Sequence, residues 1–274
     1  MRVTATIDVY GERIAATAGD RWALAYGDWV QLFDGDVPAG ELPRAPERIT
    51  DLRYADHTLL AAPSRATPDG EWEDLPRLYA AIDPWKVVAA TWAGDRLLVA
   101  EAAPDGGFEQ HVRLYDGATR APGDALWVDS EWMRVEVVAA SHDRLAAAAL
   151  EVRVWDATGR DQLLVVPERG KQVRRVVLAE ADVIVGYADG HVAVPGRAGW
   201  DAHADEASAI ALHPDGERIA TGGNDGRVAL WSLDGELLDE TTTQAEIVDV
   251  TFLGDDRVLA LHRLPETGVS VVEI

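Results

Sequence analysis

Apolar residues along this chain occur in runs of four to eight, separated by Gly, Asp, Asn and Pro. The pattern is clearest between His203 and Trp231, where three apolar runs are divided by Pro214-Asp215-Gly216 and by Asn224-Asp225-Gly226. Apolar runs of this length between turn-forming residues are typical of short β-strands, because a helix needs a longer stretch with a 3.6-residue period. The pattern therefore predicts an all-β chain.

The strand pattern repeats along the sequence at intervals of about 40 residues, the period of a four-stranded unit. The residues aligned at the end of each predicted third strand are Phe33, Tyr79, Tyr115, Trp155, Pro195, Trp231 and Val272. Flanking residues recur as well, as in Leu32-Phe33-Asp34-Gly35 and Leu114-Tyr115-Asp116-Gly117. The repeat also assigns the Ala-rich segment Leu145–Leu150 to the second strand of the fourth unit rather than to a helix.

The unit ending at Trp231 resembles a WD repeat, and the whole chain is similar to the WD-repeat β-propeller family. The resemblance implies a seven-bladed β-propeller of four-stranded antiparallel blades. We expect one domain, 1–274, with blades at approximately 11–45, 46–86, 87–130, 131–170, 171–205, 206–245, and 246–274 plus 1–9.

The last unit lacks a fourth strand, and the β-like run Arg2–Ile7 has no hairpin partner of its own. We therefore expect Arg2–Ile7 to pair beside Gly268–Glu273 and to close the ring, which leaves no long unpaired sheet edge. Blade two is the irregular unit, because there is little room for a fourth strand between Tyr79 and Val87.

In WD repeats, a His, a Ser or Thr, an Asp and a Trp form a hydrogen-bonded tetrad within one blade. Residue by residue, the resemblance assigns these positions in blade six to His203, Thr221, Asp225 and Trp231. A buried polar group needs a partner, so a complete network of this kind would stabilise the blade. Blade six is the one blade whose sequence carries the full set.

The composition is strongly acidic, with a net charge of −23, and Lys86 and Lys171 are the lysines of the chain. Two explanations stay open: adaptation to a cytoplasm of high salt, and a surface that binds basic partners. Both argue against nucleic acid as a partner, because phosphate binding needs a basic surface. The absence of cysteine excludes disulfides, and no apolar stretch is long enough to span a membrane, so we expect a cytoplasmic protein.

The sequence contains few signs of catalysis. It has no G-x-S-x-G, no Gly-rich phosphate loop and no H-E-x-x-H, and its seven histidines lack the spacing of a metal site. The repeated Asp-Gly pairs lack the spacing of a calcium loop and are expected to form turns. We therefore predict no cofactor, no metal and no enzymatic activity.

Aromatic residues in predicted loops provide the candidate binding surface. The chain has ten tryptophans, more than the repeat accounts for. The rings expected on one face over blades two to four, with an acidic rim, are Trp72, Trp85, Phe108 and Trp132, and the rim is Glu71, Glu73, Glu109 and Glu131. Such rings are typical of interaction hot spots, but they could equally fold back over the apolar ends of the blades.

The function expected from the resemblance is a non-catalytic platform for protein–protein interaction. The alternatives are an enzyme or small-ligand sensor with its site at the mouth of the central channel, and a subunit of a permanent complex. If the aromatic rings are core residues, the next candidate surface is the basic loop that carries Arg169, Lys171, Arg174 and Arg175.

Overall fold

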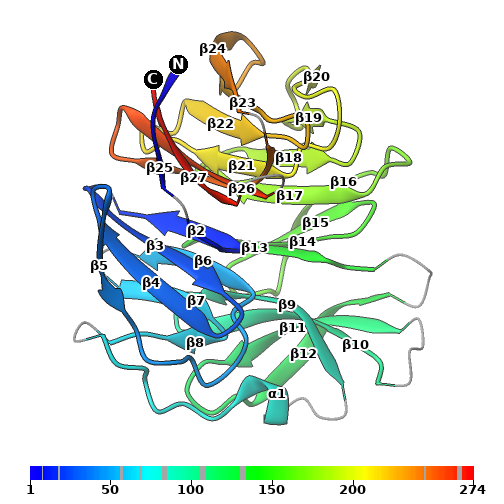
Figure 1. Cartoon of the computed structure of the whole chain (residues 1–274). Coiled ribbons are helices and arrows are strands. Elements are labelled where there is room, and N and C mark those ends of the chain that lie inside the picture. The colour runs from blue at the N-terminus through cyan, green and yellow to red at the C-terminus, as the bar shows by residue number, and fades with distance from the viewer. Residues whose placement is uncertain are drawn as a thin grey trace.

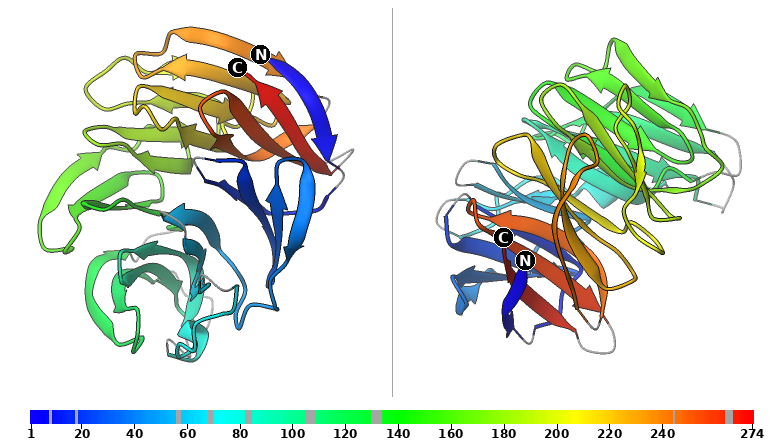
Figure 2. Two further views of the ribbon diagram at one scale, coloured as in Figure 1. Left: turned by 90° about the vertical axis from the view of Figure 1, so that its left-hand side faces the viewer. Right: turned by 90° about the horizontal axis from the view of Figure 1, so that it is seen from above.

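The computed structural model describes residues 1–7, 9–17, 19–55, 58–67, 70–81, 85–104, 109–129, 134–243, 245–263 and 267–274. Its strands form seven antiparallel sheets arranged as the blades of a propeller, which confirms the predicted fold class. Figure 2 shows the blades following one another around a ring in chain order, with the last blade beside the first.

Blades one, two and three contain strands β2 to β12. Blade one consists of β2 (Arg13–Ala16), β3 (Arg21–Tyr26), β4 (Trp29–Asp34) and β5 (Val37–Glu41). Blade two consists of β6 (Asp51–Ala55), β7 (Thr58–Ala62) and β8 (Ser64–Arg65), and is followed by the short helix α1 (Leu78–Ala81). Blade three consists of β9 (Lys86–Ala93), β10 (Arg96–Ala102), β11 (Gln110–Asp116) and β12 (Pro122–Asp129).

The later blades are more regular. Blade four consists of β13 (Val137–Ala140), β14 (Arg144–Ala148), β15 (Val152–Asp156) and β16 (Gln162–Val166). Blade five consists of β17 (Val173–Leu178), β18 (Val183–Tyr187), β19 (His191–Ala193) and β20 (Trp200–Asp201). Blade six consists of β21 (Ala209–Leu212), β22 (Arg218–Gly222), β23 (Arg227–Ser232) and β24 (Leu237–Thr242).

The two ends of the chain together form blade seven. Its strands are β25 (Glu246–Leu253), β26 (Arg257–Arg263), β27 (Gly268–Glu273) and β1 (Arg2–Ile7). Strand β1 pairs antiparallel with β27, from Arg2 opposite Glu273 to Ile7 opposite Val269. The termini therefore lie side by side, and the predicted closure of the ring by the N-terminal strand is confirmed (Figures 1 and 2).

The hydrophobic core is divided into seven clusters, each lying between two neighbouring blades. Successive residues of a strand point to opposite faces, so each second strand contributes to the clusters on both sides. On β7, Leu59 packs towards blade one and Leu60 towards blade three. On β14, Leu145 packs towards blade three and Ala146 towards blade five. This burial on both faces explains why apolar residues form continuous runs, and why Leu145–Ala148 is a strand as predicted.

Tight turns connect several of these strands. Gly27 has φ +60° between β3 and β4, where Tyr26 pairs with Trp29, and Gly94 has φ +65° between β9 and β10. Two-residue hairpin turns favour this left-handed conformation, which glycine adopts without strain.

Blade two departs from the prediction. The repeat placed the end of its third strand at Tyr79, but this residue lies in α1, and the third strand is β8. The chain turns back directly after β7, so that Ala61 pairs with Ser64. Pro76 cannot donate to a sheet ladder, which opposes a strand leading up to residue 79. Within the described residues blade two has three strands, where four were predicted for each blade.

A smaller correction concerns blade five. The repeat placed the end of the third strand at Pro195, but β19 ends at Ala193. A proline at that position has no N–H to offer to the neighbouring strand, so the ladder stops before it. Phe33, Tyr115, Trp155, Trp231 and Val272 lie in third strands of their blades.

Candidate functional site

The four polar residues singled out in blade six are joined by hydrogen bonds. The Trp231 Nε1–H donates to Thr221 Oγ1 over 2.9 Å, and Thr221 Oγ1 lies 2.9 Å from His203 Nε2. His203 Nδ1 lies 3.0 Å from Asp225 Oδ1. The Asp225 carboxylate also accepts the backbone N–H groups of Ala204 and Arg227. The network thus connects β22 and β23 to the segment that precedes β21.

Burial and charge fix the protonation states in this network. His203, Thr221 and Trp231 are each at most 5% exposed. Burial lowers the pKa of His203, although the nearby Asp225 opposes this shift. Burial raises the pKa of Asp225, but hydrogen bonds from the backbone of Ala204 and Arg227 and from His203 outweigh it and leave the pKa below its usual value. A neutral imidazole between a carboxylate and a hydroxyl, all enclosed, suits a structural role.

Two of the predicted surface tryptophans pack against the core. Trp72 does not lie in a loop between the second and third strands, as predicted; it follows β8 and forms a bridge with Ala66. Its ring packs against the cluster between blades one and two, and its Nε1–H donates to the Pro43 carbonyl over 2.7 Å. Trp85 precedes β9, packs against the cluster between blades two and three, and stacks on His111 with ring centroids 4.4 Å apart.

The acidic rim is only partly described. Glu71 is exposed, Glu73 lies 3.8 Å from Arg65, and Glu109 Oε1 lies 2.9 Å from His111 Nε2. Phe108, Trp132 and Glu131 lie outside the described residues, so the four-ring patch stays a prediction. For Trp72 and Trp85, the packing corresponds to the alternative in which such rings cover the apolar ends of the blades.

Two of the residues predicted for the basic loop between blades four and five, Arg174 and Arg175, lie in strand β17, and the three arginines of the set form ion pairs with acids. Arg169 pairs with Asp189 at 3.0 Å, and Arg174 pairs with Glu206 at 3.1 Å. The Arg175 guanidinium forms an ion pair with Asp249 of β25. Lys171 is exposed. These pairs connect neighbouring parts of the ring and leave less free positive charge than the sequence suggests.

Polar side chains from the innermost strands bridge blades that are not neighbours. Arg53 on β6 donates to the Ala140 carbonyl at the end of β13 over 2.8 Å, and burial lowers the pKa of this guanidinium. Asp249, the partner of Arg175, is 1% exposed and accepts the N–H of Ile14 over 3.2 Å. Both arginines therefore connect blades across an intervening one. No group of three or more metal-binding side chains occurs in the described part of the chain.

The irregular end of blade two is held in place by residues outside that blade. Arg120, from the turn between β11 and β12, donates to the carbonyls of Pro63 and Pro76, each over 2.9 Å. This side chain is 2% exposed, and its guanidinium lies 5.1 Å from the centre of the Trp92 ring. Glu47 accepts the N–H of Leu78 at the start of α1 over 2.8 Å. These bonds replace the strand pairing that a complete blade would have.

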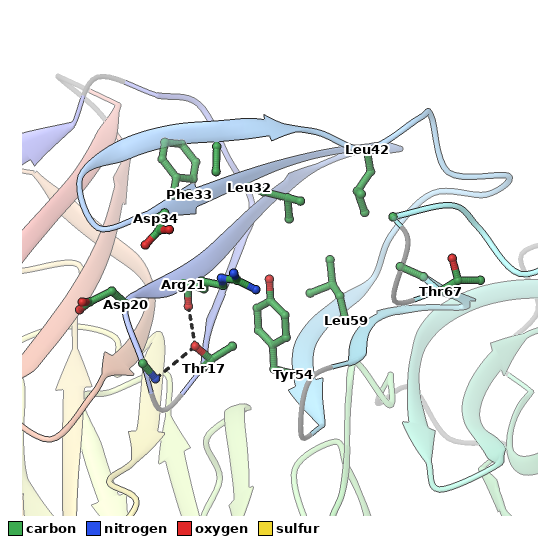
Figure 3. Close-up of a pocket in the computed structure, with 14 residues that line it drawn as sticks. Thr17, Asp20, Arg21, Leu32, Phe33, Asp34, Leu42, Tyr54, Leu59 and Thr67 are labelled. Atoms are coloured by element: carbon green, nitrogen blue, oxygen red, sulfur yellow. Dashed lines mark hydrogen bonds between the residues drawn. The ribbon is translucent and has the colours of Figure 1, made fainter.

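A cavity of about 810 Å³ lies between blades one and two, where blade two lacks regular outer strands (Figure 3). Its volume is within the range of small-molecule and peptide-anchor pockets. The apolar lining residues are Leu32, Phe33, Ala39, Leu42, Leu59 and Ala66. The polar and charged lining residues are Thr17, Asp20, Arg21, Asp34, Tyr54 and Thr67. Apolar walls with a few polar groups are the usual composition of a binding pocket.

The sequence prediction did not find this cavity. The one signal was the shortage of residues for a fourth strand in blade two, which indicated irregularity but not an opening. The lining residues come from the turns and strands of two blades, between Thr17 and Gly70, and those that belong to the repeat pattern, Leu32, Phe33 and Asp34, indicated a strand end and not a cavity. The cavity is lined by residues of the turn that follows β2 and by Tyr54 of β6 and Leu59 of β7, whereas the aromatic patch was predicted for the loops between second and third strands and for those that lead into the next blade.

No helix among the described residues has both the length and the apolar character needed to cross a membrane. Neither a protein-family model nor a curated protein matches the sequence.

Solved structures match the fold at low sequence identity. The β-propeller domain of Cps50 (Swd1) from Myceliophteria thermophila aligns with a TM-score of 0.73 and 16% identity, over 100% of this chain and 99% of that one. The computationally designed protein Ika8 aligns with a TM-score of 0.66 and 15% identity over the full length of both chains. Raptor from Chaetomium thermophilum aligns with a TM-score of 0.73 and 13% identity over 99% of this chain, which spans 28% of Raptor. At these identities the similarity establishes the propeller fold that this chain shares with them.

Proposed function

We propose that this protein is a non-catalytic platform for protein–protein interaction, and that a partner docks in the cavity between blades one and two. The observation that carries the proposal is the irregular blade two, which has three strands within the described residues and lies beside a partly open space with apolar walls and charged groups. An apolar side chain of a partner buried in such a pocket would be a hot spot, surrounded by polar contacts at the rim.

Three features support a binding role. Two carboxylates on the innermost strands already have partners: Asp249 pairs with Arg175, and Asp51 accepts the Thr91 hydroxyl over 2.6 Å. The blade-six histidine is enclosed within its network. The cavity, by contrast, is hollow and includes exposed charged residues at its edge, such as Arg21 and Asp34. The net charge of −23 would attract a partner whose surface is positively charged around the apolar residue that enters the cavity.

Blocking the cavity tests this proposal. Ala39 is exposed on the outer strand of blade one and lines the cavity, so Ala39→Trp would fill it with little effect on the fold. Leu163→Trp is the matched control, because Leu163 is 55% exposed on the outer strand of blade four and does not line the cavity. Proteins captured from the native host at native salt would be compared for the two variants and the wild type, and direct binding would then be measured with the purified partner.

We expect Ala39→Trp to abolish binding of the purified partner and Leu163→Trp to leave it unchanged. Equal binding by the wild type and Ala39→Trp would place the partner on another surface. If that occurs, the part of the predicted aromatic patch that carries Phe108 and Trp132 is the next surface to test.

A further inference from the structure

Three charged residues line the cavity, Asp20, Arg21 and Asp34, and they differ in their ion-pair partners and in the direction of their side chains. The Asp20 carboxylate forms an ion pair with Arg257 of β26, and in Figure 3 it points away from the cavity. Arg21 and Asp34 are opposite each other on β3 and β4, but no ion pair joins them. The Arg21 side chain instead extends towards the Tyr54 hydroxyl (Figure 3). In the described part of the chain, its guanidinium has no ion-pair partner.

Tyr54 adds a neutral donor beside this cation. Burial raises the pKa of its phenol, and the positive charge of Arg21 only partly counteracts this shift. The hydroxyl therefore keeps its proton at neutral pH and can donate a hydrogen bond. A guanidinium and a phenol that face the same space are suited to a carboxylate, because charge-assisted hydrogen bonds to a planar anion are strong and directional.

The apolar side of the same cavity limits what can carry that carboxylate. Leu32, Leu42 and Leu59 line it together with Arg21 and Tyr54, so the ligand needs an apolar group close to its negative charge. Asp34 at the edge and the net charge of −23 oppose a second acid in the ligand. A C-terminal residue with an apolar side chain meets these conditions, because its side chain and its α-carboxylate share one Cα. The preceding residues of a basic chain would then lie against the acidic surface.

We propose that the cavity binds the C-terminus of a partner polypeptide. Its α-carboxylate pairs with Arg21 and Tyr54, and its apolar side chain packs against Leu32, Leu42 and Leu59. This inference rests on the proposed function, since it specifies which part of the partner enters the cavity.

The minimal probe of such a terminus is N-acetyl-L-leucine, and N-acetyl-L-leucinamide is its uncharged counterpart. Binding of each to the full chain would be followed by NMR chemical-shift changes at the salt concentration that gives the highest Tm. We expect the acid to bind at least about tenfold more tightly than the amide, which is the effect of one charge-assisted interaction. We expect shifts at cavity residues, such as Thr67 and Leu59.

Substitutions then assign the carboxylate to Arg21. Arg21→Gln should reduce the affinity for the acid to that for the amide, and Tyr54→Phe should weaken binding of the acid alone. Arg160→Gln is the matched control, because Arg160 is exposed on blade four and away from the cavity, and it should leave both affinities unchanged. Circular dichroism would verify that each variant is folded.

Each outcome decides the proposal. Equal affinity for acid and amide would show that Arg21 does not select a carboxylate, and would overturn this inference while leaving the platform proposal to the Ala39→Trp experiment. The inference would also be overturned if neither probe changed the NMR chemical shifts of cavity residues. If hexanoate bound as tightly as N-acetyl-L-leucine, the ligand of the cavity would be a small amphipathic acid and not a polypeptide terminus, and the inference would be overturned.

Discussion

Blade six and blade two are built from the same repeat but are stabilised in different ways. Blade six has four strands and an internal network in which His203 connects Asp225 to Thr221. Blade two has three described strands, and its irregular end is fixed from outside by Arg120 of blade three. The difference shows that a blade can lack its own polar network when a neighbour supplies the hydrogen bonds. The cavity lies between this irregular blade and blade one.

The two mechanisms have different consequences for function. In blade six the polar groups of the network find their partners within the blade, and their side chains are largely buried. External support leaves part of the interface between blades one and two open, with Arg21 and Tyr54 beside it. A binding site is therefore expected at the irregular blade rather than at the regular one.

The largest effect is expected from removing the external support of blade two. Arg120→Ala would leave the carbonyls of Pro63 and Pro76 without their donor and would remove the guanidinium from the Trp92 ring. We expect a loss of about 3 kcal/mol, because hydrogen bonds to charged groups contribute about 1.5–3 kcal/mol each. Denaturant unfolding measures this loss, and Arg77→Ala, at an exposed position in the same segment, is the control. A loss no larger than that of the control would mean that the segment is held by other contacts.

Removing the internal network of blade six should cost less. Asp225→Ala would take away the acceptor for His203 and for the N–H groups of Ala204 and Arg227. We expect a loss of about 1–3 kcal/mol, the usual cost of leaving a buried donor unpaired. Asp225→Asn should lose less, because its side-chain oxygen can still accept. A Tm identical to that of the wild type would indicate that water replaces the carboxylate.

Acid should weaken blade six through His203. Its pKa is lowered by burial in the folded state, so the unfolded chain takes up the proton first as the pH falls. The full stabilisation is present above the unfolded value near 6.5, and it decreases as the pH falls below that value towards the folded pKa. The slope should reach at most about 1.4 kcal/mol per pH unit for one proton.

Unfolding measured between about pH 7 and 5 checks this slope. His203→Gln should abolish it, because glutamine does not titrate. A variant with the same pH dependence as the wild type would assign the titration to another group. Asp225 acts in the same direction at lower pH, because its lowered pKa gives stabilisation that is lost below about 3.8.

Salt should have the smallest effect on how much each blade's hydrogen bonds contribute to the stability of the protein. If the charge of −23 is an adaptation to salt, the Tm of the whole protein should rise between about 0.1 and 2 M KCl, where repulsion between exposed carboxylates is screened. The loss caused by Asp225→Ala should stay nearly constant, because that network is largely buried and buried pairs are screened less. A Tm that does not change with KCl would favour the other explanation of the acidity, a surface for basic partners.

The seven-bladed ring and its closure were predicted from the residue pattern together with the resemblance to WD repeats. Both follow from local patterns: apolar runs between turn residues, repeated about every 40 residues, and an unpaired strand at each end of the chain. The resemblance to a WD repeat also assigned His203, Thr221, Asp225 and Trp231 to one hydrogen-bonded network. These interactions lie within one repeat, so their spacing is visible in the order of residues.

The path of blade two and the opening beside it depend on contacts between residues far apart in the chain. Arg120 reaches a carbonyl 44 residues away, Glu47 meets Leu78 across 31 residues, and Trp72 meets Pro43 across 29. Contacts over such separations depend on how neighbouring blades pack, which no local pattern encodes. For the same reason Trp72, predicted to be a surface residue, packs against the core, and Arg21 and Tyr54, which belong to no motif, face one cavity.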